Sequence, residues 1–419
     1  MFDVTPSDRE PWGQKMMNIL SALACRPGFS FVPSSSSATL PDKVLGHGGL
    51  NPRFLGCGGV AVDDNDLGNS RSKPVNTNAV DVLRCMLATF SETLYTANPL
   101  EKNQFIGAMT NMADVHNVTL AYSLLNLSLT YDPSGTFAYT SHWTDTAGEV
   151  LAYAMQVQLA VMNYGLFQGN NTFWAVVENL KSKRDLAWVS EGMLRLLSNR
   201  YKAANTWLPM SQKELDIHAP LILVLLKLLQ KNPALREVMA LSVDMDELMA
   251  SLLFIAYDDT VYKRGLLKPV GCIMLLLSKD ATLCKMLSKP FNGCMPVKLP
   301  KVQGNLIDLL VVVFHHIINL NEEWIRPIYD QFWAILHNVS PYCFMAPTGG
   351  AAKLVALLDV FSNPSRPVES GLLFCRVRLA ALEGPVLPFC RARCAVLRSP
   401  VSLPWRVRFC SSEEPGLVF

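Results

Sequence analysis

The adjacent histidines His315 and His316 are the most ligand-like pair in the sequence. Adjacent side chains of a helix diverge by about 100°, and the positions one turn further on hold Asn319 and Leu320. The HExxH arrangement of a helical zinc site is therefore absent. We interpret the pair as core or groove histidines and expect no metal site there.

Two glycine runs resemble phosphate-binding or oxyanion turns, namely GHGG at 46–49 and GCGG at 56–59. Neither run follows a predicted strand and opens a predicted helix, and neither carries the Lys-Ser/Thr pair of a P-loop. Both are interpreted as flexible loops. The sequence thus predicts no cofactor.

Other groups that could carry chemistry are equally poorly arranged. Four cysteines near the end of the chain could be imagined as a zinc site, but their spacing is irregular: Cys375, Cys390, Cys394 and Cys410. No GxSxG motif is present, and no nucleophile, base and orienting group stand at a readable spacing. We expect no catalytic residues and no enzyme activity.

Composition narrows the class of protein further. The chain has 419 residues, is 50% hydrophobic and carries a formal net charge of +2. It lacks the Lys/Arg cluster or basic helix face that follows nucleic-acid phosphates. The N-terminal segment has acidic residues where a secretory signal has basic ones, so we interpret the protein as facing the cytosol with its 11 cysteines reduced.

The stretch 306–320 indicates the kind of structural element that would position the polar residues considered above. It is apolar except for Asp308, His315 and Asn319, which on a helix point within roughly 20° of Asp308. A helix that is apolar on all sides but one narrow stripe must be covered by several neighbours. Amphipathic patterns at 325–339, with Pro327 in the first turn, and at 351–361 predict two more helices, and together the three indicate a stacked-helix scaffold.

The rest of the chain extends this stack. Periodicity predicts helices at 12–24, 79–95 and 115–129, and four or five more between 147 and 287, with breaks at 165–171, 207–211, 232–233 and 257–261. Residues 25–78, 129–146 and 290–303 are predicted loops, and no segment is convincing as a strand. The expected organisation is a short helix and a Gly/Ser/Pro-rich loop at 1–78, an α-helical solenoid at 79–361, and a tail at 362–419.

The predicted tail differs from the rest of the chain. It holds eight arginines, no lysine and seven prolines, and no helical period survives in it. We expect it to be disordered or non-native, derived from an unspliced intron or a shifted reading frame; the alternative is a genuine disordered basic tail.

Several long, collinear motifs resemble the high-temperature-induced dauer-formation protein family, relatives of dymeclin. The motifs are VLRCMLATFSETLY at 82–95, LTYDPSG at 129–135, GMLRLLSN at 192–199, NLIDLLVVVFHHII at 305–318 and HNVSPY at 337–342, within a similarity over about 12–363. The resemblance implies an all-α, armadillo- or HEAT-like scaffold without catalytic activity. It also implies peripheral association with Golgi and trans-Golgi membranes, and support of secretory-granule formation and protein sorting.

Two departures from the family pattern matter. Members commonly begin with Met-Gly for N-myristoylation, whereas Phe2 follows Met1 here, so a lipid anchor on this chain is not expected. Members also continue with further helices where this chain has its arginine-rich tail. We therefore expect a partial family member.

The sequence thus predicts a scaffold whose partners are proteins and the Golgi membrane surface, with no nucleic acid and no small-molecule substrate. The alternatives are a soluble cytosolic armadillo or HEAT adaptor, and an integral membrane protein with short helical spans. Candidate partner-binding residues lie in the aromatic loop and on the polar stripe: Tyr131, Asp132, Trp143, Asp308, His315 and Asn319.

Overall fold

The computed structural model describes most of the region between residues 11 and 362. The described residues are 11–24, 29–30, 77–95, 103–110, 115–131, 133, 146–164, 171–206, 212–242, 244–258, 261–291, 299–300, 302, 304–320, 322–343 and 350–362. Most of the loops predicted at 25–78 and 129–146, and the predicted tail from residue 363 on, lie outside them.

The described chain is helical throughout. Its only extended pairing is an isolated bridge between Pro290 and Asn305. Short 3₁₀ helices lie at η2 (Ser91–Leu94), η5 (Glu323–Ile328) and η6 (Ser340–Tyr342). The α-helices are α1 (Trp12–Ala24), α2 (Thr77–Phe90), α3 (Gln104–Thr110), α4 (Val115–Thr130), α5 (Thr146–Asn163), α6 (Thr172–Glu178), α7 (Lys183–Leu197), α8 (Asn199–Asn205), α9 (His218–Lys231), α10 (Pro233–Ser242), α11 (Met245–Tyr257), α12 (Val261–Leu277), α13 (Ala281–Leu287), α14 (Leu306–Asn319), α15 (Tyr329–Val339) and α16 (Gly350–Ser362).

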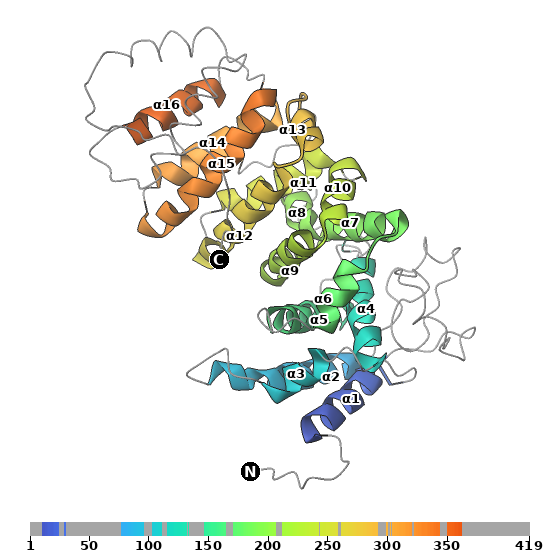
Figure 1. Ribbon diagram of the computed structural model, residues 1–419. Helices are drawn as coiled ribbons and strands as arrows, with labels where there is room; N and C mark the ends of the chain where they lie inside the picture. The colour runs from blue at the N-terminus through green and yellow to red at the C-terminus, as the bar shows by residue number, and fades with distance from the viewer. Residues whose placement is uncertain are drawn as a thin grey trace, which may run out of the picture.

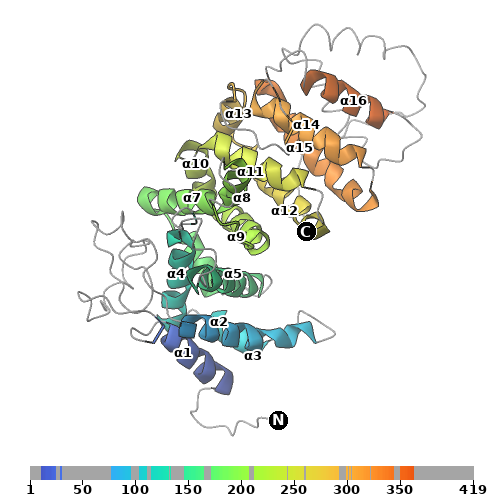
Figure 2. The same ribbon diagram turned by 180° about the vertical axis from the view of Figure 1, so that it is seen from behind.

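The longer helices pack in two rows that run the length of the molecule (Figure 1). One row consists of α2, α5, α9, α12 and α15, each packed on the next; the other consists of α1, α4, α7, α11, α14 and α16. Each of the first five helices in the second row also contacts a helix of the first row. The shorter helices α3, α6, α8, α10 and α13 pack against these rows. The chain therefore forms a layered stack that ascends from α1 to α16, as the view from behind also shows (Figure 2).

One continuous apolar core fills the space between the rows. Near the C-terminal end, the rings of Phe314 on α14 and Phe332 on α15 stack with centroids 4.1 Å apart. The prediction that α14 is a core helix is confirmed, because its apolar residues are buried on several sides. The all-α class is confirmed for the residues that the structure describes.

Buried asparagines tie successive layers together. Asn171 caps α6 through Oδ1, and its Nδ2 donates to the carbonyl of Val161 at 2.8 Å, near the end of α5. Asn232 does the same for α10, accepting from the N–H of Leu235 and donating to two carbonyls at the end of α6. Asn103 and Asn305 act likewise at the starts of α3 and α14. Each side chain satisfies orphan groups of two helix ends at once, which fixes the relative position of the two helices.

Several predicted boundaries need correction. The segment before α15 is 3₁₀ at 323–328 and not α-helical, since Pro327 has no N–H and restricts the residue before it. Among the residues that the structure describes, nine helices, α5 to α13, replace the four or five predicted up to residue 287, and α3 was not predicted at all. Three of those nine, α6, α8 and α13, span seven residues each, about two turns, which is too short for a periodic pattern.

No helix in the described residues combines the length and apolarity needed to cross a membrane. The alternative of an integral protein with short helical spans therefore finds no support in them.

Candidate interaction surfaces

The end of α4 is held by a side chain of α7. Arg195 donates from Nε to the carbonyl of Tyr131 at 3.3 Å, and from Nη2 to the carbonyl of Leu129. Carbonyls at a helix C-terminus have no partner within their own helix. Arg195 supplies that partner and fixes the direction in which the chain leaves α4.

Gly192, one turn before Arg195, allows α7 to approach so closely. A Cβ on Gly192 would lie 2.7 Å from Cδ2 of Leu129 and 3.2 Å from its Cα. Any larger residue would force the two helices apart. The motifs at 129–135 and 192–199, which carry part of the family resemblance, thus meet in space at this junction.

Of the three residues predicted in the aromatic loop, the structure places Tyr131. It is half-buried and packs against the core, so part of its surface is already used within the fold. Asp132 and Trp143 lie outside the described residues. The loop as a partner-binding surface stays a prediction, with Tyr131 as its anchored end.

The predicted polar stripe on α14 does not form one surface. Asp308 is fully buried, and its carboxylate accepts from the N–H of Asn305 at 3.2 Å in a capping box that Asn305 completes. Gly304 and Gly350 pack so closely that a Cβ on either would collide with this carboxylate. The prediction of Asp308 as a partner-facing residue is therefore wrong, since spacing alone cannot tell a buried cap from an exposed polar position.

His315 and Asn319 occupy the accessible end of the same stripe. Asn319 is exposed, and its Nδ2 lies 3.1 Å from the ring nitrogens of His315. Partial burial lowers the pKa of His315, and the charges of Lys353 on α16 and of His316 lower it further. These two residues remain candidates for contact with a partner.

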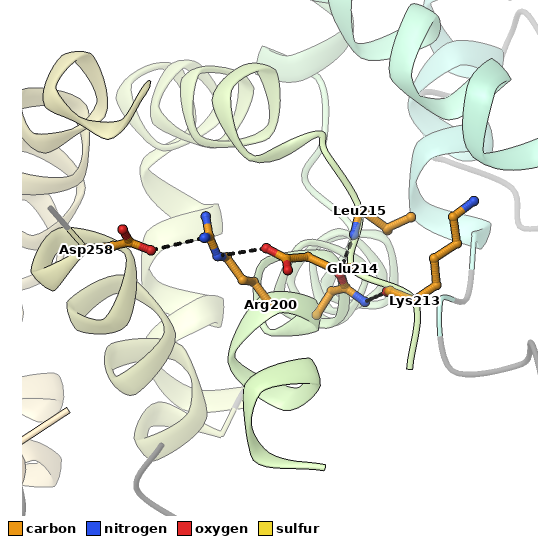
Figure 3. Close-up of polar contacts among 6 residues, drawn as sticks. Arg200, Lys213, Glu214, Leu215 and Asp258 are labelled. Atoms are coloured by element: carbon orange, nitrogen blue, oxygen red, sulfur yellow. Dashed lines mark hydrogen bonds and ion pairs between the residues drawn. The ribbon is translucent and has the colours of Figure 1, made fainter. Parts of the chain in front are cut away.

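His316 lies next to a second polar cluster, which was not predicted from the sequence. Its ring lies 4.4 Å from that of Tyr257, the last residue of α11. The next residue, Asp258, accepts from Nη2 of Arg200 at 3.0 Å, and Nε of Arg200 pairs with Glu214 at 3.0 Å (Figure 3). One guanidinium on α8 therefore joins the end of α11 to the segment that leads into α9.

Asn199 strengthens this junction. Its Nδ2 donates to the carbonyl of Lys213 at 2.9 Å, and its Oδ1 accepts from the N–H of Leu215 at 3.0 Å. The cluster begins at Asn199, the last residue of the GMLRLLSN motif, which is the one feature of the sequence that could have indicated it. The cluster therefore connects two layers of the stack, and its charged side chains pair largely with one another.

The described residues offer little for catalysis. They contain no group of three or more His, Cys, Asp or Glu that could hold a metal ion. Of the cysteines that the structure places, Cys85, Cys272 and Cys284 are free thiols. Burial raises the pKa of the Cys284 thiol to about 11, which leaves it a poor nucleophile at neutral pH.

Comparison with known proteins shows what this architecture belongs to. The family model for dymeclin, described as the Dyggve-Melchior-Clausen syndrome protein, matches residues 6–370. The chain is a member of the dymeclin family. The predicted resemblance to the dymeclin-related family is thereby confirmed.

Curated relatives agree with this membership. Protein HID1 from Homo sapiens is 28% identical over 315 residues, which is 68% of this chain and 40% of the relative. Protein HID1 from Dictyostelium discoideum is 23% identical over 400 residues, 85% of this chain and 43% of the relative. The dymeclin-family chain thus spans about two fifths of the length of these relatives. No solved structure gives a significant match.

Proposed function

We propose that this chain is a non-enzymatic scaffold that associates peripherally with Golgi and trans-Golgi membranes and supports vesicle or secretory-granule formation and protein sorting. The observation that carries the proposal is membership of the dymeclin family over residues 6–370. The Golgi role is what the resemblance to the dauer-formation proteins implies for such a member.

The architecture supports a scaffolding role. Two helix rows joined layer by layer present long, regular faces and expose side chains at fixed spacing. We assign this stack to the armadillo or HEAT type, in which each repeat consists of two or three helices. The division into 1–78, 79–361 and 362–419 is part of the same proposal, although α1 from the first segment packs into the stack.

Co-fractionation of the tagged full chain with a trans-Golgi marker tests the proposal. We expect the chain in the Golgi fractions and its release by alkaline carbonate, as for a peripheral protein. A chain that stays entirely in the cytosolic fraction would contradict the proposal and favour a soluble adaptor that positions a partner protein.

A variant test addresses the candidate surface. Changing Tyr131, Trp143 and His315 together to alanine is expected to reduce Golgi recruitment while leaving the helical circular dichroism spectrum intact. The matched control changes the exposed residues Tyr95 and His337 to alanine. Equal recruitment of both variants would reject Tyr131, Trp143 and His315 as the contact residues.

A further inference from the structure

In the middle of the first row, α9 and α12 each leave one side of the helix accessible, and we refer to these two sides together as the α9–α12 face. On both helices the accessible positions recur every three or four residues, as expected for one side of a helix. The two helices pack directly on each other. The accessible positions that form this face are Pro220, Leu223, Lys227 and Gln230 on α9, and Gly265, Lys268, Cys272 and Leu275 on α12.

Lys227 carries a charge that nothing in the described chain neutralises. Its side chain is partly buried, and that burial together with the like charge of Lys231 one turn on lowers its pKa. Lys231 itself is paired, since it lies 3.5 Å from Glu178 and stands over the ring of Trp174. Among the described residues, no ion pair or hydrogen bond engages Lys227.

Lys268 extends the positive charge onto α12. It is exposed and forms no ion pair with the residues that the structure describes. Its charge opposes the effect of burial, which raises the pKa of the Cys272 thiol. Cys272 in turn accepts a hydrogen bond from Nε2 of Gln331 on α15 at 3.4 Å, so Lys268 lies on the side of α12 that continues towards α15.

At the N-terminal end of the first row, the positive charge is compensated by neighbouring acidic residues. Arg84 on α2 lies 3.6 Å from Asp81 and 4.0 Å from Glu149 on α5, and its guanidinium stands over the ring of Tyr153. Within the described part of the row, uncompensated lysines therefore gather on α9 and α12. Half-buried leucines, Leu223 and Leu275, lie on the same face.

We infer that this face of α9 and α12 binds an acidic segment of another protein, whose carboxylates pair with Lys227 and Lys268 while its apolar side chains contact Leu223 and Leu275. Unpaired cations beside apolar surface are complementary to such a segment. The row lies on the inner side of the curved stack (Figures 1 and 2). The inference rests on the proposed scaffold function and names the chemistry of its partner.

Fluorescence anisotropy with a short labelled peptide of alternating glutamate and leucine tests the inference on the full chain. The wild type is expected to bind this peptide and not its lysine–leucine counterpart, with an affinity that falls as salt rises. The double variant K227E/K268E is expected to bind about tenfold more weakly or worse, because two attractions become repulsions.

The control variant K181E/K183E carries the same change of net charge at two exposed lysines, Lys181 just before α7 and Lys183 at its first position. It should bind the peptide within about twofold of the wild type. Equal binding by wild type and K227E/K268E, with unchanged helicity, would overturn the inference. So would lysine-dependent binding to vesicles of phosphatidylcholine and phosphatidylserine without binding to the peptide.

Golgi co-fractionation of K227E/K268E separates this inference from the proposed function. A variant that loses peptide binding yet remains with the Golgi supports the docking face as a site distinct from membrane recruitment. If the wild type binds the peptide but does not co-fractionate with the Golgi, the docking face stands and the proposed location fails.

Discussion

Gly192 on α7 lies directly against Leu129 on α4, with the position of its missing Cβ only 3.0 Å from the Cβ of Leu129. Because backbone as well as side chain closes this space, Leu129 cannot relieve a clash by changing rotamer alone. The contact lets Arg195 reach the last carbonyls of α4. The packing of two layers therefore depends on the absence of one methyl group.

Gly192→Ala should consequently destabilise the fold, although alanine is the better helix former. Overpacking of this kind costs about 1–3 kcal/mol, which urea denaturation followed by circular dichroism would measure. The matched control is Gly265→Ala on α12, where a Cβ would meet nothing within 4 Å. That variant should gain up to about 1 kcal/mol from helix propensity. A Gly192→Ala protein as stable as the wild type would show that the two helices can separate freely.

Much of the helical stack could be predicted from the sequence, because long helices carry a readable period. The apolar run that ends at Asn319 and the Asn232-Pro233 break both correspond to observed helix limits. The shortest helices escaped prediction since two turns hold too few apolar positions to define a face.

The candidate surfaces were harder to predict, because they depend on contacts between distant segments. Arg195 bonds to residues 64 and 66 positions earlier, and nothing in the local pattern fixes that register. Asp308 and His315 share one stripe by spacing, yet one is a buried cap and the other is accessible. Spacing gives the direction of a side chain but not what covers it.

The hydrogen bonds of the buried Asn232 predict that replacing its amide with a carboxylate destabilises the fold, whereas the same change at an exposed position does not. Asn232→Asp keeps the acceptor for the N–H of Leu235 but replaces two donor bonds, at 2.8 and 2.9 Å, with repulsion between a carboxylate and two carbonyls. We expect a loss of at least about 2 kcal/mol in the free energy of unfolding at neutral pH. Gln156→Glu, the same chemical change at an exposed position of α5, should be close to neutral. Similar stabilities for the two variants would contradict the tie.

The Arg200 cluster predicts two unequal ion pairs. The Asp258 side chain is 9% exposed and that of Glu214 is 57% exposed, while both contact the same guanidinium at 3.0 Å. Asp258→Asn should therefore cost roughly 2–3 kcal/mol, and Glu214→Gln less than about 1 kcal/mol. Double-mutant cycles with Arg200→Gln would measure both couplings. In about 1 M salt the Glu214 coupling should vanish and the Asp258 coupling persist; equal couplings would be inconsistent with this geometry.

His315 predicts a loss of stability on acidification. Burial, Lys353 and His316 hold its folded pKa below the ordinary value of about 6.5, so the unfolded chain binds the proton more readily. The stability associated with neutral His315 is present above that ordinary pKa and is lost as the pH falls through it towards the folded pKa. Melting temperatures between about pH 7.5 and 5.5 should therefore fall less steeply for His315→Gln than for the wild type. His337 on α15 is exposed, and His337→Gln serves as the matched control. If both variants kept the wild-type slope, the surroundings of His315 would not disfavour its charged form.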